Sequence, residues 1–325
     1  MKLHSALLGA ALALSAIAPM QALAQDYPAK PVRVIVPFPP GGISDVLARA
    51  LSTELGKQLG QPFIVENKSG AGGNIGNAQV ASAPPDGYTL AVALDTSITL
   101  NPLIYPSIGF DPMTRLVPIT MASDMPMVLV VRADSKVKTL RDLVAMGQKS
   151  SQALAFPSGG PGSPSNVLNR LLEKEAKFNI LDVAYTGNPP QIMSVLSGET
   201  QAGFAATAGV IGHIQSGKMT ALAIAANTRY DLLPKIPTMA EAGVPGVDTQ
   251  NWQVVLAPAG TPKKIVDTLN RHINQIIETH EFQRTVRDLG MTPLGKASPE
   301  STANRLRQEH EKWKSFVRST RIDVN

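Results

Sequence analysis

A short strand that ends in a proline- and glycine-rich loop and leads into a helix constrains this chain more than any other feature. Residues 32–37 are rich in β-branched residues, the loop Pro37–Gly42 follows, and a helical pattern begins at Ser44. Proline restricts the path of such a loop, and glycines leave backbone N–H groups uncovered. Because a helix N-terminus adds unpaired donors and partial positive charge, the stretch predicts either a plain turn or a seat for an anion such as a carboxylate.

Strand and helix patterns alternate after this stretch. The helix predicted at 44–59 carries a leucine every fourth residue, which gives one buried stripe. A strand at 63–65, a helix opened by the glycines of 70–76 and a strand at 88–94 follow. This order predicts a parallel sheet with right-handed crossovers. The loops that follow its strands, including residues 95–99, are expected on the edge of the sheet where such folds bind ligands.

The middle of the chain repeats the same arrangement. A strand at 154–156 runs into Pro157–Ser165, where Ser163 is an expected N-cap and Pro164 the first helical residue. Farther on, Thr238 and Glu241 predict a capping box for a helix that ends before Gly243. We therefore expect an α/β protein of two domains, formed by residues 25–124 with 251–325 and by residues 125–250.

The first 24 residues are typical of a cleaved export signal. Lys2 is followed by an apolar segment at 7–18 and by Ala22-Leu23-Ala24, so the mature chain is expected to begin at Gln25 and to be periplasmic. A membrane anchor is the alternative, but the apolar segment is short for a span. The chain has no cysteine, which excludes disulfides and thiol catalysis. The formal net charge is +5, but the basic residues form no run interleaved with aromatic residues. A nucleic-acid partner is therefore not expected.

Enzyme motifs are weak or absent. The glycines of 70–76 resemble a dinucleotide loop, but the third glycine of that motif would fall on Ile75. No G-x-S-x-G motif occurs, and the histidines are scattered. Asp45 or Asp95 could serve as a general base in a hydrolase or isomerase, but no partner for that chemistry is evident. We therefore expect no catalytic residues, no cofactor and no metal, and a site that binds an anion and releases it.

Several segments together resemble one family across nearly the whole mature chain. The chain is similar to periplasmic solute-binding proteins of the tripartite tricarboxylate transporter type, also called the Bug or TctC family. The matching segments are Tyr27-Pro28 through Asp45, Glu66-Asn67 with Gly70–Gly76, Pro85–Tyr88, Asn101-Pro102, Tyr185 with Gly187, His213, Ile236–Thr238 with Glu241–Gly243, and Ala257–Pro262.

The resemblance implies a two-domain Venus-flytrap fold, a monomer that captures a small carboxylate in the cleft between its domains and delivers it to a membrane permease. It also implies that a loop of each domain holds the carboxylate, partly through ordered waters. The residues implied at these loops are Phe38, Pro40, Gly41, Gly42 and Asp45 in the first domain, opposite Ser158, Gly159, Ser163 and Ser165 in the second, with Ser97 in the loop after the third strand. A sensor subunit that presents the ligand to a membrane kinase would use the same fold.

Two departures from the family pattern concern the ligand. Where relatives commonly have Asp followed by Asn, this chain has Ala205-Ala206-Thr207, and where they often have Thr-His it has Ser165-Asn166. We expect Ala206 to border a distal end of the pocket that is less polar than usual and does not recognise an amino group. Tyr185 and Trp252 are candidates to line that end, although Trp252 fits a core position equally well. Asp45 is either a helix N-terminal stabiliser or a residue that holds water in the site.

Overall fold

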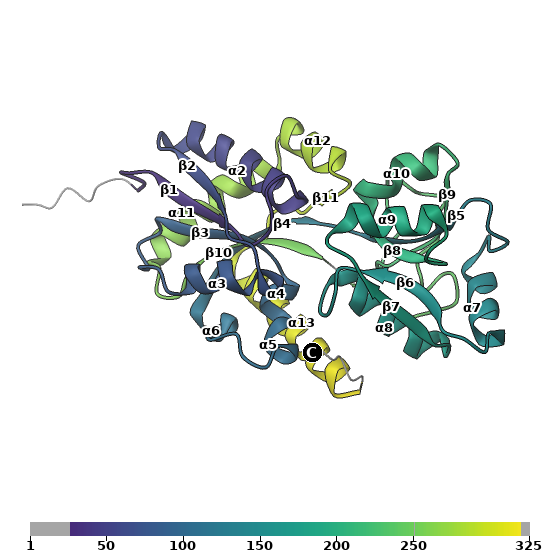
Figure 1. Cartoon of the computed structure of the whole chain (residues 1–325). Coiled ribbons are helices and arrows are strands. Elements are labelled where there is room, and N and C mark those ends of the chain that lie inside the picture. Colours follow the sequence, from purple (N-terminus) through teal and green to yellow (C-terminus); the bar gives the residue numbers. More distant parts are fainter. Residues whose placement is uncertain (1–26, 250, 320–325) are drawn as a thin grey trace, which may run out of the picture.

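The computed structural model describes residues 27–249 and 251–319, which form two lobes that lie side by side (Figure 1). The predicted export signal at 1–24 lies outside the described residues. Within the described part of the chain, no helix is both long and apolar enough to cross a membrane.

The first lobe is built on a six-stranded sheet in the order β11-β4-β10-β3-β1-β2. Strand β1 pairs in parallel with β2 and β3, which confirms the parallel arrangement predicted for the first three strands. Strand β10 is antiparallel to both β3 and β4 and is buried along its whole length, as a central strand covered on both faces should be. The strands are β1 (Val32–Val36), β2 (Phe63–Asn67), β3 (Thr89–Leu94), β4 (Leu116–Asp124), β10 (Trp252–Pro258) and β11 (Thr292–Pro293).

Helices cover this sheet from both ends of the sequence. Helix α2 buries Leu47, Leu51 and Leu55 of the predicted leucine stripe. Helices α11 and α13 pack on β4, and Trp313 of α13 is fully buried, so these C-terminal helices cover the sheet of the first lobe. The helices of this lobe are α2 (Ile43–Leu59), η1 (Ala71–Gly73), α3 (Asn74–Ala81), α4 (Thr96–Thr99), α5 (Asn101–Ile104), α6 (Pro112–Arg115), α11 (Lys263–Ile277), α12 (His280–Asp288) and α13 (Pro299–Ser319).

The second lobe contains a three-stranded sheet in the order β8-β5-β9 and a parallel pair of strands, β6 and β7. Both pairings of β5 are antiparallel. Strand β6 also lies against β8, so the two sheets share one core. The elements are β5 (Met127–Arg132), α7 (Leu140–Lys149), β6 (Leu154–Ser158), α8 (Pro164–Ala176), β7 (Ile180–Ala184), α9 (Asn188–Ser197), β8 (Gly203–Ala206), α10 (Thr207–Gln215) and β9 (Met219–Ile224).

The helix predicted after Thr238 does not form. The reciprocal bonds of the capping box are present, because the Thr238 N–H donates to Glu241 at 2.8 Å and the Glu241 N–H donates to the Thr238 hydroxyl at 3.1 Å. Gly243, at φ +96°, then ends the segment after a single turn. The prediction of a helix was wrong because a capping box stabilises a first turn but does not prevent a left-handed residue from closing it.

The chain crosses between the lobes twice, and the two crossings are bonded to each other. The first runs from Asp124 at the end of β4 to Met127 at the start of β5, and the second passes through Asn251 into β10. The Met125 N–H donates to the Asn251 carbonyl at 2.9 Å, and the Asn251 N–H donates to an Asp124 carboxylate oxygen at 3.1 Å. The separation of the sheets at these crossings supports our proposed domain boundaries at 124/125 and 250/251.

Candidate functional site

The loop between β1 and α2 presents a helix N-terminus with free donors. Gly41 adopts φ +77° and has open space around it, and Gly42 is the N-cap of α2 without a side-chain cap. Among the described residues, the N–H groups of Ile43 and Ser44 have no hydrogen-bond partner, and the Gly42 N–H makes only a long bond of 3.4 Å to Pro39. Unpaired first-turn donors of this kind favour an anion.

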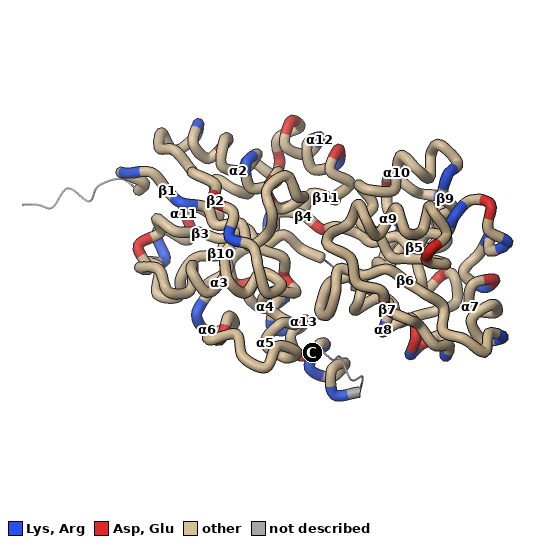
Figure 2. The backbone as a smooth tube through the Cα atoms, in the orientation of Figure 1, with Lys and Arg blue, Asp and Glu red and all other residues tan. Residues whose placement is uncertain are grey.

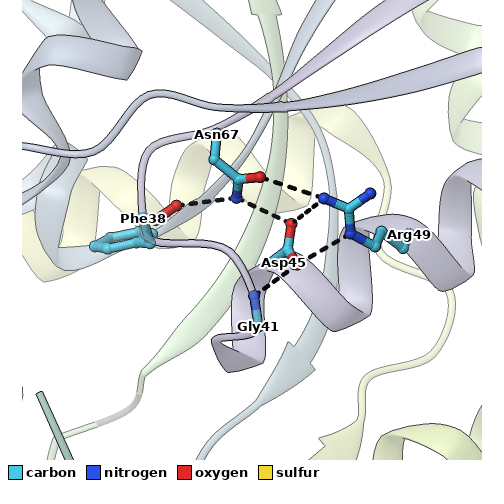
Figure 3. A network of polar contacts seen from close by, with 5 residues as sticks. All are labelled: Phe38, Gly41, Asp45, Arg49 and Asn67. Atoms are coloured by element: carbon cyan, nitrogen blue, oxygen red, sulfur yellow. Dashed lines mark hydrogen bonds and ion pairs between the residues drawn. The ribbon is translucent and has the colours of Figure 1, made fainter.

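The conformation of this loop is held by Asp45, Arg49 and Asn67, which we call the Asp45 clamp (Figure 3). One oxygen of the Asp45 carboxylate accepts from the Gly41 N–H at 2.9 Å and from Arg49 Nε at 3.0 Å. The other accepts from Arg49 Nη2 and from Asn67 Nδ2, both at 2.9 Å. Asn67 Nδ2 also donates to the Phe38 carbonyl at 3.0 Å, so the clamp fixes both ends of the loop.

These four donors occupy the acceptor positions that a carboxylate offers. Asp45 is 3 % exposed, and burial alone would raise its pKa, but the hydrogen bonds from Arg49, Gly41 and Asn67 together lower the pKa below the ordinary value. Asp45 therefore stays ionised and is saturated by protein donors. Of the two roles left open by the sequence, this geometry favours the structural one.

Ser97 lies beside the same loop, but its hydroxyl proton is used in a hydrogen bond within the protein. Its hydroxyl donates to the Leu94 carbonyl at 2.6 Å and accepts from Asn77 Nδ2 at 2.9 Å. Gly73, at φ +97°, separates the Phe38 ring from Ser97, and a Cβ there would lie 3.3 Å from both side chains. The two loops predicted at one sheet edge, 37–44 and 95–99, are thus neighbours.

The loop between β6 and α8 in the second lobe is cross-linked by its own hydroxyls. Ser158 donates to Asp182 at 2.6 Å and accepts from the Gly160 N–H at 3.0 Å. The Gly159 N–H donates to the hydroxyls of Ser163 and Ser165, each at 3.1 Å. The N–H groups offered by this loop are therefore largely satisfied inside it.

The start of α8 is formed as predicted. Ser163 is the N-cap and accepts from the Asn166 N–H at 3.3 Å, with Pro164 at the first helical position. Ser165 donates its proton to Gln191 at 3.1 Å. Among these hydroxyls, that of Ser163 keeps a proton that is not committed to a single acceptor.

Neither loop carries a charged side chain from residue 37 to 44 or from 159 to 165. Figure 2 shows the charged residues of the second lobe mainly toward its outer end, and the β6–α8 loop, which faces the first lobe, is uncharged. An anion between these loops would meet neutral donors.

The remaining predicted residues lie farther inside. Trp252 is 2 % exposed, packs in the core of the first lobe and has the Arg305 guanidinium 4.6 Å above its ring. The Tyr185 hydroxyl is buried near Ser194 and Glu199, and burial raises its pKa. Ala206 ends β8 and is buried where α10 begins. Asp95 is fully buried, and its carboxylate accepts from the Trp252 N–H at 3.0 Å, which places it in the sheet rather than at the surface.

Sequence reasoning missed the residues that hold these loops. Arg49 stands four positions after Asp45, a spacing that indicates an ion pair on a helix and could have been noticed. Asn67 was part of a matching segment, but nothing in it indicated a contact with Asp45 across 22 residues. Asn77, Asp182 and Gln191 gave no local signal at all.

Comparison with known proteins assigns the family. The profile of the family described as "Tripartite tricarboxylate transporter family receptor" matches residues 47–322. BugT of Bordetella pertussis is 37 % identical over 298 residues, covering 91 % of both chains. A structure of an R. palustris protein with adipate is 30 % identical with a TM-score of 0.82 and covers 90 % of this chain and 98 % of that one.

MatC from Rhodopseudomonas palustris with bound malate is 29 % identical with a TM-score of 0.80, covering 90 % of this chain and all of its own. A structure described as the periplasmic binding protein BugD is 32 % identical with a TM-score of 0.80, covering 91 % of this chain and 99 % of its own, and this likeness agrees with the two α/β lobes described above. The chain belongs to the receptor family of the tripartite tricarboxylate transporters.

Proposed function

We propose that this protein is an extracytoplasmic receptor that captures a small organic carboxylate and delivers it to a tripartite tricarboxylate-type membrane transporter. The observation that carries the proposal is the N-terminus of α2, where the N–H groups of Ile43 and Ser44 are unpaired while the Asp45 clamp fixes the preceding loop. Neutral donors bind an anion firmly in a closed cleft and release it when the lobes separate, as delivery requires. The adipate and malate held by related structures support a carboxylate.

The ligand-binding residues follow from the protons that remain available. We propose that the N–H groups of Gly42, Ile43 and Ser44 receive the carboxylate in the first lobe, with Phe38, Pro40 and Gly41 shaping the approach. In the second lobe the Ser163 hydroxyl is the proposed donor. We assign the other polar groups of these loops a structural role, because each already donates a hydrogen bond within the protein. They are the hydroxyls of Ser97, Ser158 and Ser165 and the N–H of Gly159.

The distal end of the ligand is proposed to be apolar or weakly polar. Ala206 has only a methyl side chain, and the Thr207 hydroxyl donates to the Pro126 carbonyl at 2.6 Å. Neither residue therefore supplies the negative charge that would pair with an ammonium group. Aspartate and glutamate are therefore expected to bind poorly. Tyr185 is the proposed aromatic neighbour of this end, whereas the core position of Trp252 favours a structural role.

The remaining parts of the proposal concern the cellular setting. The segment 1–24 has the sequence features of a cleaved signal, and we propose that the mature protein works in the periplasm as a monomer without a cofactor and without catalysis. Its partner is the membrane permease of the transporter.

Thermal unfolding of the mature protein with a panel of mono-, di- and tricarboxylates, aromatic acids and amino acids tests the proposal. A ligand at about a hundred times its Kd stabilises the folded state by roughly 2.7 kcal/mol, a shift of several degrees. A hit that is recovered unchanged after incubation supports a receptor. Chemical turnover of that compound, or no hit with protein shown to be folded and free of retained ligand, would contradict the proposal.

A further inference from the structure

The tip of the β6–α8 loop touches the first lobe at a position where only glycine fits. A Cβ placed on Gly162, which has φ +75°, would lie 2.3 Å from Cδ1 of Ile104 in α5. Ordinary contacts between carbon atoms are about 3.5–4.0 Å, so even one methyl group there would need about 1.2 Å more room. The next atoms, Ile104 Cγ1 and Asn101 Oδ1, are each 3.7 Å away, so a single methyl group of Ile104 makes the close approach.

Both sides of this contact are held in place by hydrogen bonds. The Gly162 N–H donates to Asn166 Oδ1 at 3.2 Å within the second lobe. On the first lobe, Asn101 donates to the Gly72 carbonyl at 3.0 Å and to Asn74 at 2.8 Å. Ile104 belongs to the main hydrophobic core and is 7 % exposed. The Gly162 backbone is therefore held by its loop, and the body of the Ile104 side chain is held by the core, so that its terminal methyl group is the atom that meets the second lobe.

The contact lies beside both proposed ligand-binding loops. Gly162 is the residue immediately before Ser163, and Gly72 precedes Gly73, which packs against Phe38 and Ser97. The lobes also meet at Gly290, whose Cβ position lies 2.3 Å from the Ala208 nitrogen in α10, but of these two contacts the Gly162–Ile104 contact is the one beside the proposed ligand-binding loops.

We propose that the Gly162–Ile104 contact is a specificity determinant that sets the length of carboxylate the closed protein accepts. This inference rests on the proposed function and deepens it. A methyl group on Gly162 would hold the lobes apart by about the length that one extra methylene adds to an extended ligand. Short ligands would then lose contact with one lobe, while longer homologues would keep contact with both.

The test replaces Gly162 by alanine and measures the affinity of a homologous series of dicarboxylates by titration calorimetry. Gly162→Ala is expected to weaken binding of the shortest ligand of the wild-type protein at least tenfold, about 1.4 kcal/mol. The loss for a homologue longer by one or two methylenes should be at least threefold smaller. Adding Ile104→Val, which removes only Cδ1, should return the affinity to within threefold of Ile104→Val alone.

Gly160→Ala is the matched control. Gly160 lies in the same loop at φ +87° but has nothing within 4 Å of its Cβ position, so it carries the same backbone strain without the contact. Equal losses in Gly160→Ala and Gly162→Ala, or no recovery with Ile104→Val, would mean that the alanine distorts the loop, and the inference would fall. A uniform loss across the series would refute the length selection.

A second measurement separates this inference from the proposed function. The chain has no native cysteine, so Lys149→Cys and Arg271→Cys give one label site on each lobe for spin–spin distance measurement. Gly162→Ala should lengthen this distance in the closed population relative to Gly160→Ala, and Ile104→Val should reverse the change. Unchanged distances would refute the role of the Gly162–Ile104 contact even if the wild type binds carboxylates. A wild type that binds no carboxylate would refute the proposed function and the ligand-length selection with it, whether or not the distances change.

Discussion

Replacing Asn67 by alanine is expected to weaken ligand binding about tenfold without unfolding the protein. Asn67 contacts no proposed ligand atom, yet its amide donates to the Phe38 carbonyl at 3.0 Å and to the Asp45 carboxylate at 2.9 Å. Without these bonds the loop before α2 is tied only at Gly41, and the donors of the helix N-terminus are no longer held toward the ligand.

The magnitude follows from the two lost bonds. A neutral hydrogen bond contributes about 1 kcal/mol, and a bond to a charged acceptor about 1.5–3 kcal/mol. Because the Asn67 side chain is only half-buried, we take the lower end and expect a loss of about 2 kcal/mol for the loop conformation. If the loop then holds its binding conformation about a tenth of the time, the apparent affinity falls tenfold.

The assay is titration calorimetry with the best ligand, together with thermal unfolding of each variant. Glu66→Ala is the control, since Glu66 precedes Asn67 in β2 and pairs with Arg33 on the opposite face of the sheet at 2.7 Å. That exposed pair is expected to contribute less than about 1 kcal/mol and nothing to binding. If Asn67→Ala bound the ligand as tightly as Glu66→Ala does, the clamp would not control the loop and the reasoning would be wrong.

Three further predictions address other parts of the molecule. Gly42→Val should weaken ligand binding at least tenfold, roughly 1.4 kcal/mol, because its side chain stands at the proposed carboxylate seat; a folded variant with unchanged affinity in calorimetry would assign the loop a purely structural role. Ser163→Ala should cost about 1 kcal/mol of unfolding free energy in urea, since it removes the N-cap of α8; a stability equal to wild type would show that the cap is dispensable. Burial raises the pKa of Asp124 to about 6, so the folded state binds its proton more tightly than the unfolded state does, and this carboxyl destabilises the protein increasingly as pH rises from about 4 through 6. Asp124→Asn should therefore gain stability relative to wild type at pH 7.5 but not at pH 4.5, and a difference that is the same at both pH values would contradict that assignment.

The strand–loop–helix units could be predicted because they depend on local rules. The β-branched run of β1, the leucine stripe of α2 and the Ser163-Pro164 helix start are all encoded within a few residues. The segment after Thr238 shows the limit of such rules, because a capping box and a glycine can bound a segment that forms only a single turn.

The order of the sheet could not be predicted in the same way. Strand β10 enters between β3 and β4 and runs antiparallel to both, and this pairing joins residues that lie far apart in the sequence. An apolar segment such as Trp252–Ala257 predicts a buried strand, but it does not indicate its neighbours or its direction.

The direction of the hydroxyl protons likewise depends on tertiary partners. The family resemblance implied Ser97, Ser158 and Ser165 at the loops that hold the carboxylate. Each of them donates instead to an acceptor in the protein, the Leu94 carbonyl, Asp182 and Gln191 respectively. A count of polar residues around a loop therefore overstates the donors that a ligand can use.

Asp45 shows how one distant residue changes the meaning of a local pattern. A carboxylate in a loop proposed to bind carboxylates would repel its ligand if it were free. Here Arg49 neutralises it through two bonds, and Asn67 supplies a further one, so its negative charge is directed inward while it holds the Gly41 N–H. The unpaired N–H groups at the start of α2 then dominate the potential that a ligand meets. The same aspartate that looks unfavourable in sequence is thus the residue that keeps the anion seat open, and the reason lies 22 residues away in β2.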